Sequence, residues 1–196
     1  MTAQTGWKVL SEQKVYETNW LSVHHYECVA PTGHETIYGK VHFKQHAIGV
    51  LPVDEDGFTY LVGQDRFCFG AYSWELPEGG GPLGEAPLDA AKRELAEETN
   101  LAADHYIPLM ENAHFSNSIT DEVGYAFLAY GLSPCAGEPD QTEDLAVRRV
   151  HVRDVMDMMD KGEITDLFTH VMLLNAYRLA NIGKLPEYIA NAFLAR

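Results

Sequence analysis

The sequence predicts a mixed α/β fold in which β-sheets and helices form layers. In the first half, strand-like segments follow one another across short turn signals, a pattern typical of antiparallel hairpins. The last third instead carries apolar residues at helical spacing. Between them, a glycine-rich stretch leads into one further helical pattern at residues 87–99. Sheets with interspersed helices are therefore expected.

The first 67 residues are rich in predicted strands. These strands are residues 20–29, 35–43, 47–53 and 58–67. The turn signal Pro31-Thr32-Gly33 joins the first two, and Asp56-Gly57 is a strong hairpin signal between the last two. The first 45 residues thus form an N-terminal antiparallel β-segment.

Helices and two more strands are predicted in the remainder. The helix at 87–99 begins at Pro87, which suits a first helical position, although Ala86 offers no capping side chain. Strands are expected at 125–130 and 145–152, and helices at 153–161 and 166–181. Gly162 is a natural end for the first of these two helices.

Composition narrows the class of protein. A chain of 196 residues predicts one domain with a small appended piece, which we divide at residues 1–45 and 46–196. The net charge of −15 argues against a nucleic-acid partner, which needs a basic surface. Three widely spaced cysteines and no signal-like or membrane-spanning segment favour a cytoplasmic protein with reduced thiols.

The helix at 87–99 carries a cluster of carboxylates. Glu94, Glu97 and Glu98 fall on one face because residues three and four apart are neighbours on a helix. Leu88, Ala91 and Leu95 are expected on the opposite, apolar face. Convergent carboxylates suit Mg²⁺ or Mn²⁺, whereas a solvated acidic surface is the commoner outcome for such a run.

The wider spacing of this stretch resembles the Nudix box. Gly79 is followed after five residues by Glu85 and after seven more by Arg93-Glu94-Leu95-Ala96-Glu97-Glu98. One position departs, because Asn100 stands where the family has a glycine. Asn tolerates the left-handed conformation better than other non-glycine residues, so the loop–helix–loop geometry is expected to survive. The resemblance implies a Nudix fold, with mixed β-sheets sandwiched between helices.

The resemblance also implies a metal-dependent hydrolase of nucleoside diphosphates linked to another group. Glu94 and Glu98 would be direct Mg²⁺ ligands (Mn²⁺ is possible), and Glu97 would bind directly or through water. The backbone carbonyl of Glu78 would add a ligand, with the glycines at 79–81 bending the chain close to the metal. Arg93 would orient the carboxylates, with Glu85 as its partner.

Further segments resemble the ADP-ribose and nucleotide-sugar pyrophosphatase branch of the family. They include WKVLSEQKVYETNWLSV, VAPTGHETIYG, LVGQDRF, SWELPEGG and GEITDLFTHVMLLNAYRL, and together span roughly residues 7 to 180. In that branch the N-terminal strands pair with a second subunit and help to build the substrate site. The resemblance therefore implies a homodimer, although a sheet packed on its own domain remains an alternative for residues 1–45.

Matching positions imply several substrate-binding residues. Arg66 matches an arginine that contacts phosphates, although a surface ion pair is an ordinary alternative. Trp20 and Tyr38 match positions of nucleobase-stacking aromatics, and core packing is the alternative for each.

Two acidic positions are less well defined. Glu143 matches the region that supplies a general base, with Glu138, Asp140 and Asp144 nearby. Glu122 stands where the branch often has an acid, but residues 116–122 lack the Ser-Pro-Gly pattern usual there. The substrate class is therefore better supported than ADP-ribose itself.

The resulting hypothesis is a pyrophosphatase that splits ADP-ribose or a similar nucleotide sugar. Its catalytic residues would be Glu97, Glu98, Arg93 and Glu143. The alternatives are a GDP-sugar or dinucleotide coenzyme as substrate, or a non-catalytic, nucleotide-binding regulatory domain. Retention of every charged position of the box favours the enzyme.

Overall fold

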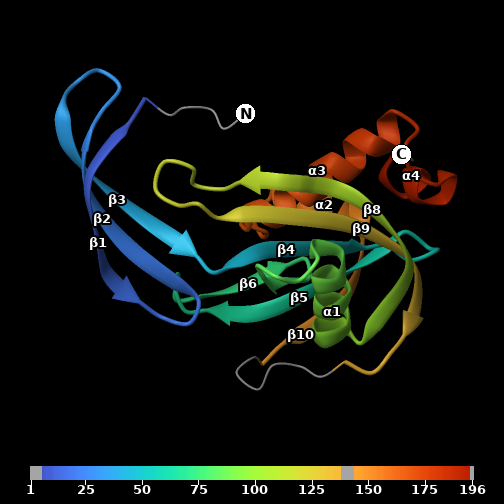
Figure 1. The fold of residues 1–196 in the computed structure, drawn as a ribbon. Coiled ribbons are helices and arrows are strands. Elements are labelled where there is room, and N and C mark those ends of the chain that lie inside the picture. The colour runs from blue at the N-terminus through green and yellow to red at the C-terminus, as the bar shows by residue number, and fades with distance from the viewer. Residues whose placement is uncertain (1–5, 138–143, 195–196) are drawn as a thin grey trace.

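The computed structural model describes residues 6–137 and 144–194, which form an N-terminal arm and a layered body (Figure 1). The arm is a three-stranded antiparallel sheet in the order β1-β2-β3. Its strands are β1 (Lys8–Glu17), β2 (Leu21–Val29) and β3 (Glu35–Phe43). The last two match the predicted strands, whereas β1 was not singled out because its residues show no apolar face.

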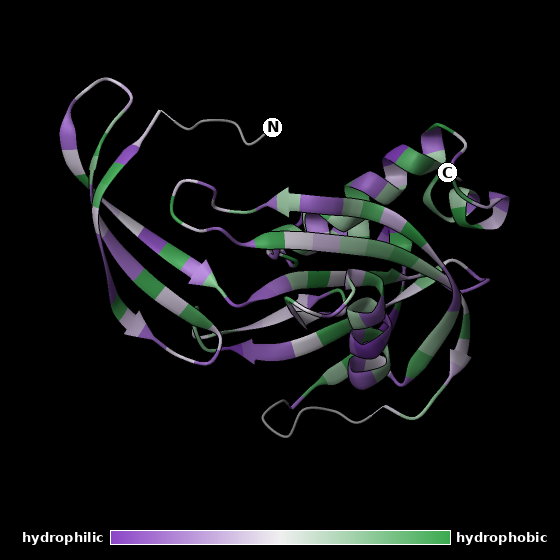
Figure 2. Ribbon diagram, in the orientation of Figure 1, coloured by the Kyte–Doolittle hydropathy of each residue, from purple (hydrophilic) through white to green (hydrophobic). Residues whose placement is uncertain are grey.

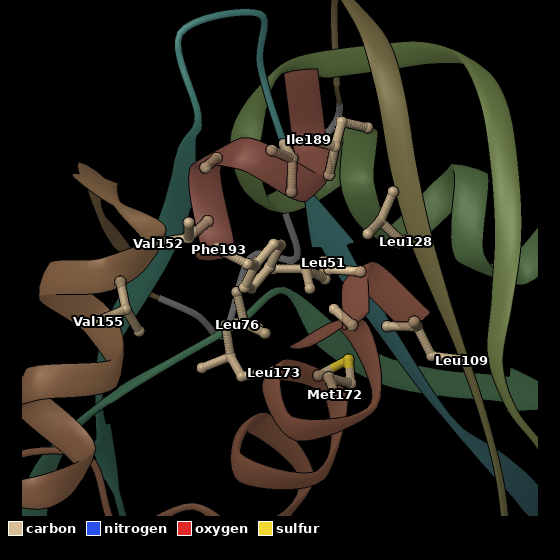
Figure 3. Packing of buried hydrophobic residues seen from close by; sticks show 14 of the residues in the cluster. Leu51, Leu76, Leu109, Leu128, Val152, Val155, Met172, Leu173, Ile189 and Phe193 are labelled. Atoms are coloured by element: carbon tan, nitrogen blue, oxygen red, sulfur yellow. The ribbon is translucent and has the colours of Figure 1, made fainter. Parts of the chain in front are cut away.

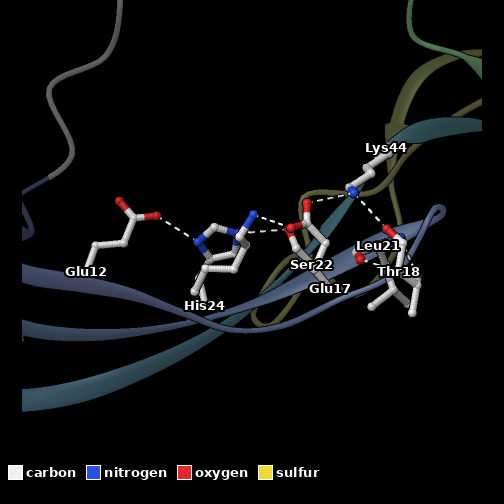
Figure 4. A network of polar contacts seen from close by, with 8 residues as sticks. Glu12, Glu17, Thr18, Leu21, Ser22, His24 and Lys44 are labelled. Carbon is white, nitrogen blue, oxygen red and sulfur yellow. Dashed lines mark hydrogen bonds and ion pairs between the residues drawn. The ribbon is translucent and has the colours of Figure 1, made fainter.

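Polar contacts hold much of the arm together, since every residue of β1 is exposed. His24 bridges two strands: its Nδ1 lies 2.8 Å from Glu12 Oε1 and its Nε2 lies 2.8 Å from Ser22 Oγ (Figure 4). At the end of the arm, Lys44 donates to Glu17 Oε1 over 2.8 Å. Figure 2 shows hydrophilic and hydrophobic bands alternating along these strands rather than one continuous apolar face.

The body contains two further sheets. A four-stranded sheet has the order β7-β4-β9-β8, in which β4 and β9 are parallel and the other pairs antiparallel. A three-stranded sheet has the order β10-β5-β6. The strands are β4 (Gln45–Pro52), β5 (Phe58–Arg66), β6 (Ala71–Glu75), β7 (Glu78–Pro82), β8 (Leu101–His114), β9 (Val123–Pro134) and β10 (Ala146–His151).

Helices cover both faces of the four-stranded sheet. They are α1 (Pro87–Thr99), α2 (Val152–Asp160), α3 (Leu167–Asn181) and α4 (Glu187–Leu194). Ile48 and Val50 of β4 pack with α1, whereas Leu51 faces the cluster that includes α3 and α4. This alternation gives the predicted sandwich of sheets between helices. Within the described ranges no helix is long and apolar enough to cross a membrane.

The larger core lies on the α2–α4 side of the body. Leu51 and Leu128 of the sheet meet Met172 and Leu173 of α3 and Ile189 of α4, and all five are fully buried (Figure 3). Burying each such side chain stabilises the fold by about 1.5–3 kcal/mol. Helix α1 packs on the opposite face of the sheet, where its Ala90, Ala91 and Leu95 are fully buried with Ile48 and Val50 of β4.

Besides β1, three features differ from the sequence-based expectations. The glycines at 79–81 do not form a bend but lie in strand β7, which pairs with β4. Strand β8 was missed because its exposed and buried residues do not alternate cleanly. Leu88 of α1 is 37% exposed, so the apolar face of the helix is built by Ala90, Ala91 and Leu95 instead.

Candidate active site

Helix α1 presents the clustered glutamates against strand β7. The helix starts at Pro87 without a side-chain cap and ends at Thr99, and Asn100, which caps this end, has φ 55° and ψ 34°. This left-handed residue donates its backbone N–H to Ala96 O, as expected for a helix end of this type. The departure from the family glycine is thus accommodated.

Arg93 ties the glutamates to the adjoining backbone. Its Nη1 donates to Glu94 Oε1 over 2.7 Å and to Glu97 Oε2 over 2.8 Å. Its Nη2 donates to Gly80 O over 2.8 Å and to Glu85 Oε2 over 3.1 Å. The predicted partnership of Arg93 with Glu85 is confirmed, and one guanidinium offsets the repulsion among three carboxylates.

Glu94 and Glu98 are buried between α1 and β7. They are 7% and 6% exposed, and Glu98 Oε2 accepts a hydrogen bond of 3.0 Å from the backbone N–H of Glu78. A Cβ on Gly79 would lie 2.2 Å from Glu94 Oε2. Only glycine therefore leaves room for this carboxylate. Position 79 requires glycine because the Glu94 side chain packs closely against it, and not because the chain bends there.

These groups line one pocket of about 260 Å³. Glu94, Glu97 and Glu98 form its acidic wall, and Trp20 from the arm and Gln45 from β4 stand at its other sides. Trp20 is 63% exposed. The tertiary structure thus brings Trp20, a predicted substrate-binding residue, to the glutamates. Gln45 was not predicted as a site residue, because nothing in the sequence except its polarity distinguishes it.

The chemistry of this pocket fits a divalent cation. Carboxylate oxygens are the ligands that Mg²⁺ and Mn²⁺ prefer, and Gly79 leaves the carboxylate of Glu94 accessible beside the backbone. Within residues 6–137 and 144–194, no three His, Cys, Asp or Glu side chains are already arranged to hold a metal. Two of the glutamates contact Arg93 instead, so metal binding would require them to turn from it.

Arg66 occupies a second acidic cluster next to the first. It donates from Nε to Glu75 Oε2 over 2.9 Å and from Nη2 to Glu78 Oε1 over 2.8 Å. Burial, together with the charges of Asp166 and Glu75, raises the pKa of Glu78 well above its ordinary value. Burial acts against ionisation of Glu75 too, but the hydrogen bonds from Arg66 and Ser73 and the charge of Arg66 together outweigh it, and the pKa of that carboxyl is lowered.

Glu122, just before β9, and Asp166, just before α3, line the same cluster. Together with Arg66 and Glu78 they line a pocket of about 260 Å³ beside Gly79. Burial raises the pKa of Glu122. Asp166 is the N-cap of α3 and accepts from the backbone N–H of Thr169 over 2.5 Å. Asp166 was not predicted as a site residue. Its position just before a helical pattern could have indicated a helix cap, but not a site residue.

Of the remaining predicted residues, Tyr38 is not brought to the glutamates. Tyr38 lines a separate pocket in the arm, where its ring meets Trp7 edge to face with centroids 5.4 Å apart. Its hydroxyl donates to Ser118 O, which fixes the loop before Glu122. Glu143 lies outside the described residues.

Comparisons with known proteins agree with this architecture. Residues 43–168 match the model of the NUDIX domain, and residues 7–41 match the nucleoside diphosphate sugar hydrolase N-terminal domain. A solved structure, described as the crystal structure of ADP compounds hydrolase, superimposes with a TM-score of 0.82 at 20% identity. That superposition covers 94% of this chain and 100% of the other, and shows the fold.

Similar curated proteins include two ADP-ribose pyrophosphatases. The one from Bacillus subtilis (strain 168) is 31% identical over 125 residues, which are 63% of this chain and 67% of that protein. The one from Mycobacterium tuberculosis (strain ATCC 25618 / H37Rv) is 29% identical over 124 residues, 61% of this chain and 59% of that protein. An RNA pyrophosphohydrolase from Thioalkalivibrio sulfidiphilus (strain HL-EbGR7) is 43% identical over 63 residues, 27% of this chain and 36% of that protein. With its domain match, its fold and the glutamates of α1, the chain belongs to the NUDIX family of hydrolases.

Proposed function

We propose that this protein is a divalent-metal-dependent pyrophosphatase of nucleoside diphosphate sugars, and that its substrate is ADP-ribose. The observation that carries the proposal is the pocket in which Glu94, Glu97 and Glu98 converge beside Gly79. The names of the ADP-ribose pyrophosphatases of B. subtilis and M. tuberculosis support this substrate. Hydrolysis adds one water across the P–O–P bridge and yields AMP and ribose 5-phosphate.

A bound Mg²⁺ or Mn²⁺ would neutralise the pyrophosphate and lower the pKa of an attacking water. Glu94 and Glu98 would hold it directly, and Glu97 directly or through water. Glu98 already accepts from the backbone of Glu78, so the carbonyl of Glu78 is the proposed backbone ligand. Because the chain has a net charge of −15, a cation is the simplest way to admit an anionic substrate.

The chain's own residues would bind and orient the substrate. Arg66 would contact the phosphates, which requires it to exchange one of its two carboxylate partners for phosphate oxygens. Trp20, exposed at the rim of the glutamate pocket, would stack on the nucleobase. Glu122 would accept hydrogen bonds from sugar hydroxyls, and Glu143 would act as the general base.

We also propose that residues 1–45 mediate homodimerisation and contribute to the substrate site, with residues 46–196 forming the hydrolase domain. The wholly exposed strand β1 supports this proposal, because it lies at the edge of its sheet, where its free side and exposed side chains such as Val9 and Val15 offer a pairing surface to another chain. A dimer would also give Tyr38, which lines a pocket other than the glutamate pocket, a second subunit's substrate to contact. Sedimentation velocity of the full chain tests this, and a monomer at micromolar concentration would refute it.

The activity is tested by phosphatase-coupled phosphate release from ADP-ribose, ADP-glucose, GDP-mannose and NAD⁺, with Mg²⁺, with Mn²⁺ and with EDTA. Glu98→Gln should abolish turnover, whereas Glu111→Gln, an exposed glutamate on β8, should not. Glu143→Gln should lower turnover while metal affinity stays near wild type. Tight binding of one compound with no release from any would support the non-catalytic alternative instead.

A further inference from the structure

The loop between β8 and β9, residues 115–122, reaches back to the arm and pairs with the outer edge of β3 (Figure 1). Val41 of β3 and Thr120 of the loop form an isolated parallel bridge. The N–H of Val41 donates to Ile119 O over 2.8 Å, and the N–H of Asp121 donates to Val41 O over 3.2 Å. The loop therefore extends the sheet of the arm by one short segment and covers an edge that would otherwise be open.

The carboxylate of Asp121 collects three donors from β3. Its Oδ1 accepts from the backbone N–H of Phe43 over 3.1 Å, and its Oδ2 lies 2.7 Å from His42 Nδ1 and 3.3 Å from Lys40 Nζ. Lys40 and His42 are two residues apart on the strand, so their side chains point to the same face of the sheet. Burial acts to raise the pKa of Asp121, but the hydrogen bonds that it accepts and the charge of His42 together outweigh burial and lower this pKa.

The contact between Asp121 and Phe43 lies at the wall of the substrate pockets. Phe43 is the last residue of β3, and Glu122 follows Asp121 directly. Phe43 and Glu122 both line the pocket beside Gly79, and both line a larger adjoining pocket of about 650 Å³. One carboxylate therefore ties the end of the arm to the segment that carries Glu122.

Glu122 depends on this backbone for its position. Its N–H donates to Thr120 Oγ1 over 3.3 Å, so its main chain is held by the paired segment of the loop. Within the described ranges, burial alone raises the pKa of its carboxyl, and no hydrogen bond or neighbouring charge contributes to that shift. The carboxyl is therefore placed by the loop and not by a side-chain partner.

The two ends of the loop are held by different contacts. At the β8 end, the ring of Phe115 meets that of Phe168 edge to face with centroids 5.2 Å apart. The same ring lies against Gly124, where an added Cβ would be 2.6 Å from Phe115 Cε2. At the β9 end, the loop is held through the side chain of Asp121. Replacing Asp121 should therefore leave Phe115 in place and loosen the segment next to Glu122.

We propose that Asp121 is a positioning residue that, through its contacts with β3 of the same chain, holds Glu122 in the substrate pocket. This deepens the proposed function and rests on it, because Glu122 is the residue proposed to accept hydrogen bonds from sugar hydroxyls. The arm thereby shapes the substrate site of its own subunit. Because a sugar contact binds the substrate and the transition state alike, its loss should raise KM and leave kcat unchanged.

The test measures kcat and KM for ADP-ribose, with Mg²⁺, in Asp121→Ala. KM should rise by about tenfold, the size expected when a hydrogen bond to a charged group is lost, while kcat stays within about twofold of wild type. The affinity for Mn²⁺, measured by calorimetric titration, should not change, because the glutamates of α1 line a different pocket. Glu35→Ala is the matched control, since it removes an exposed carboxylate of β3 and should leave KM unchanged.

A double-mutant cycle with Glu122 separates positioning from a general loosening of the fold. Glu122→Ala alone should raise KM by about tenfold, and Asp121→Ala should add less than about twofold in that background, because the side chain that it positions is gone. Independent effects would instead multiply to about a hundredfold.

Two milder variants carry the test if Asp121→Ala does not fold. Asp121→Asn keeps an acceptor for the Phe43 N–H, and His42→Ala removes one of the donors to Asp121. Each should raise KM by less than Asp121→Ala does, with kcat unchanged.

Several outcomes would overturn the proposal. A wild-type KM in these variants, or effects that multiply in the cycle, would remove Asp121 from the positioning of Glu122 and leave the proposed function standing. A fall in kcat or in Mn²⁺ affinity with KM unchanged would show that the contact acts on the metal site instead. Dissociation of a wild-type dimer by Asp121→Ala, seen by sedimentation velocity, would assign the contact to the subunit interface. Inactivity of the wild type on ADP-ribose would overturn the proposed function and this inference with it.

Discussion

Substitution of Gly79 by alanine tests the geometry of the glutamate pocket directly. The added Cβ would lie 2.2 Å from Glu94 Oε2 and 2.4 Å from its Cδ, where ordinary contact begins at 3.4 Å. The carboxylate must therefore retreat by roughly 1 Å. Because φ at Gly79 is not in the left-handed region, the backbone itself accepts alanine, and the effect is confined to the side chain it displaces.

Gly79→Ala is expected to lower kcat and metal affinity much more than the free energy of unfolding. A displacement of about 1 Å in a catalytic group can cost about 100-fold in rate, so kcat should fall by about that factor and the affinity for Mg²⁺ or Mn²⁺ should fall with it. The carboxylate is the far end of a flexible side chain, so the free energy of unfolding should fall by less than about 1 kcal/mol. The lower conformational entropy of the unfolded alanine variant stabilises the fold and offsets part of this loss.

The assay pairs phosphate release with calorimetric titration of Mn²⁺ and with urea unfolding. Gly84→Ala is the matched control, because a Cβ there meets nothing within 4 Å. The control should keep its kcat and gain about 0.4–1 kcal/mol of stability. A Gly79→Ala protein with wild-type kcat and metal affinity would refute the role assigned to Glu94.

Three further predictions concern neighbouring positions. Gly81→Ala would place its Cβ 2.9 Å from Ile48 Cγ1 in the core. Urea unfolding should therefore show a free energy of unfolding lower by about 1–3 kcal/mol, while kcat per folded molecule stays unchanged. A loss of kcat without a loss of stability would contradict this. Asn100→Gly keeps the left-handed helix end but removes the 3.1 Å hydrogen bond from Gly137 N–H to Asn100 Oδ1. The free energy of unfolding should therefore change by no more than about 1 kcal/mol and the Mn²⁺ affinity by a few-fold. A change of Mn²⁺ affinity by orders of magnitude would count against the match of Asn100 to the family's glycine. Burial raises the pKa of Glu122 above 4.5, so the native state holds its proton more tightly than the unfolded chain, and stability falls as pH rises from the unfolded to the folded pKa. Glu122→Gln should therefore gain in melting temperature over wild type as pH rises from 4 to 7, and a difference independent of pH would exclude this cause.

Local sequence was sufficient for much of the fold. Turn chemistry predicted the hairpins at Gly33 and Gly57, both of which have positive φ. Pro87 predicted the start of α1, Gly162 predicted the end of α2, and apolar residues at helical spacing predicted α3. Strand β1 was missed because its contacts are cross-strand polar pairs, such as Glu12 with His24, that leave no periodic apolar pattern. Strand β7 was missed because three glycines have low strand propensity, and pairing with β4 overrides it.

The spacing of glutamates, arginine and glycine along the chain was enough to predict the family, because residues on one helix keep their relative positions in any tertiary context. Tertiary structure alone decided what surrounds that helix. It placed Trp20 and Gln45 at the glutamates and brought together Arg66, Glu122 and Asp166 from three separate segments of the chain. It placed Tyr38 in a different pocket. Such meetings depend on the pairing of strands distant in sequence, which no local pattern encodes.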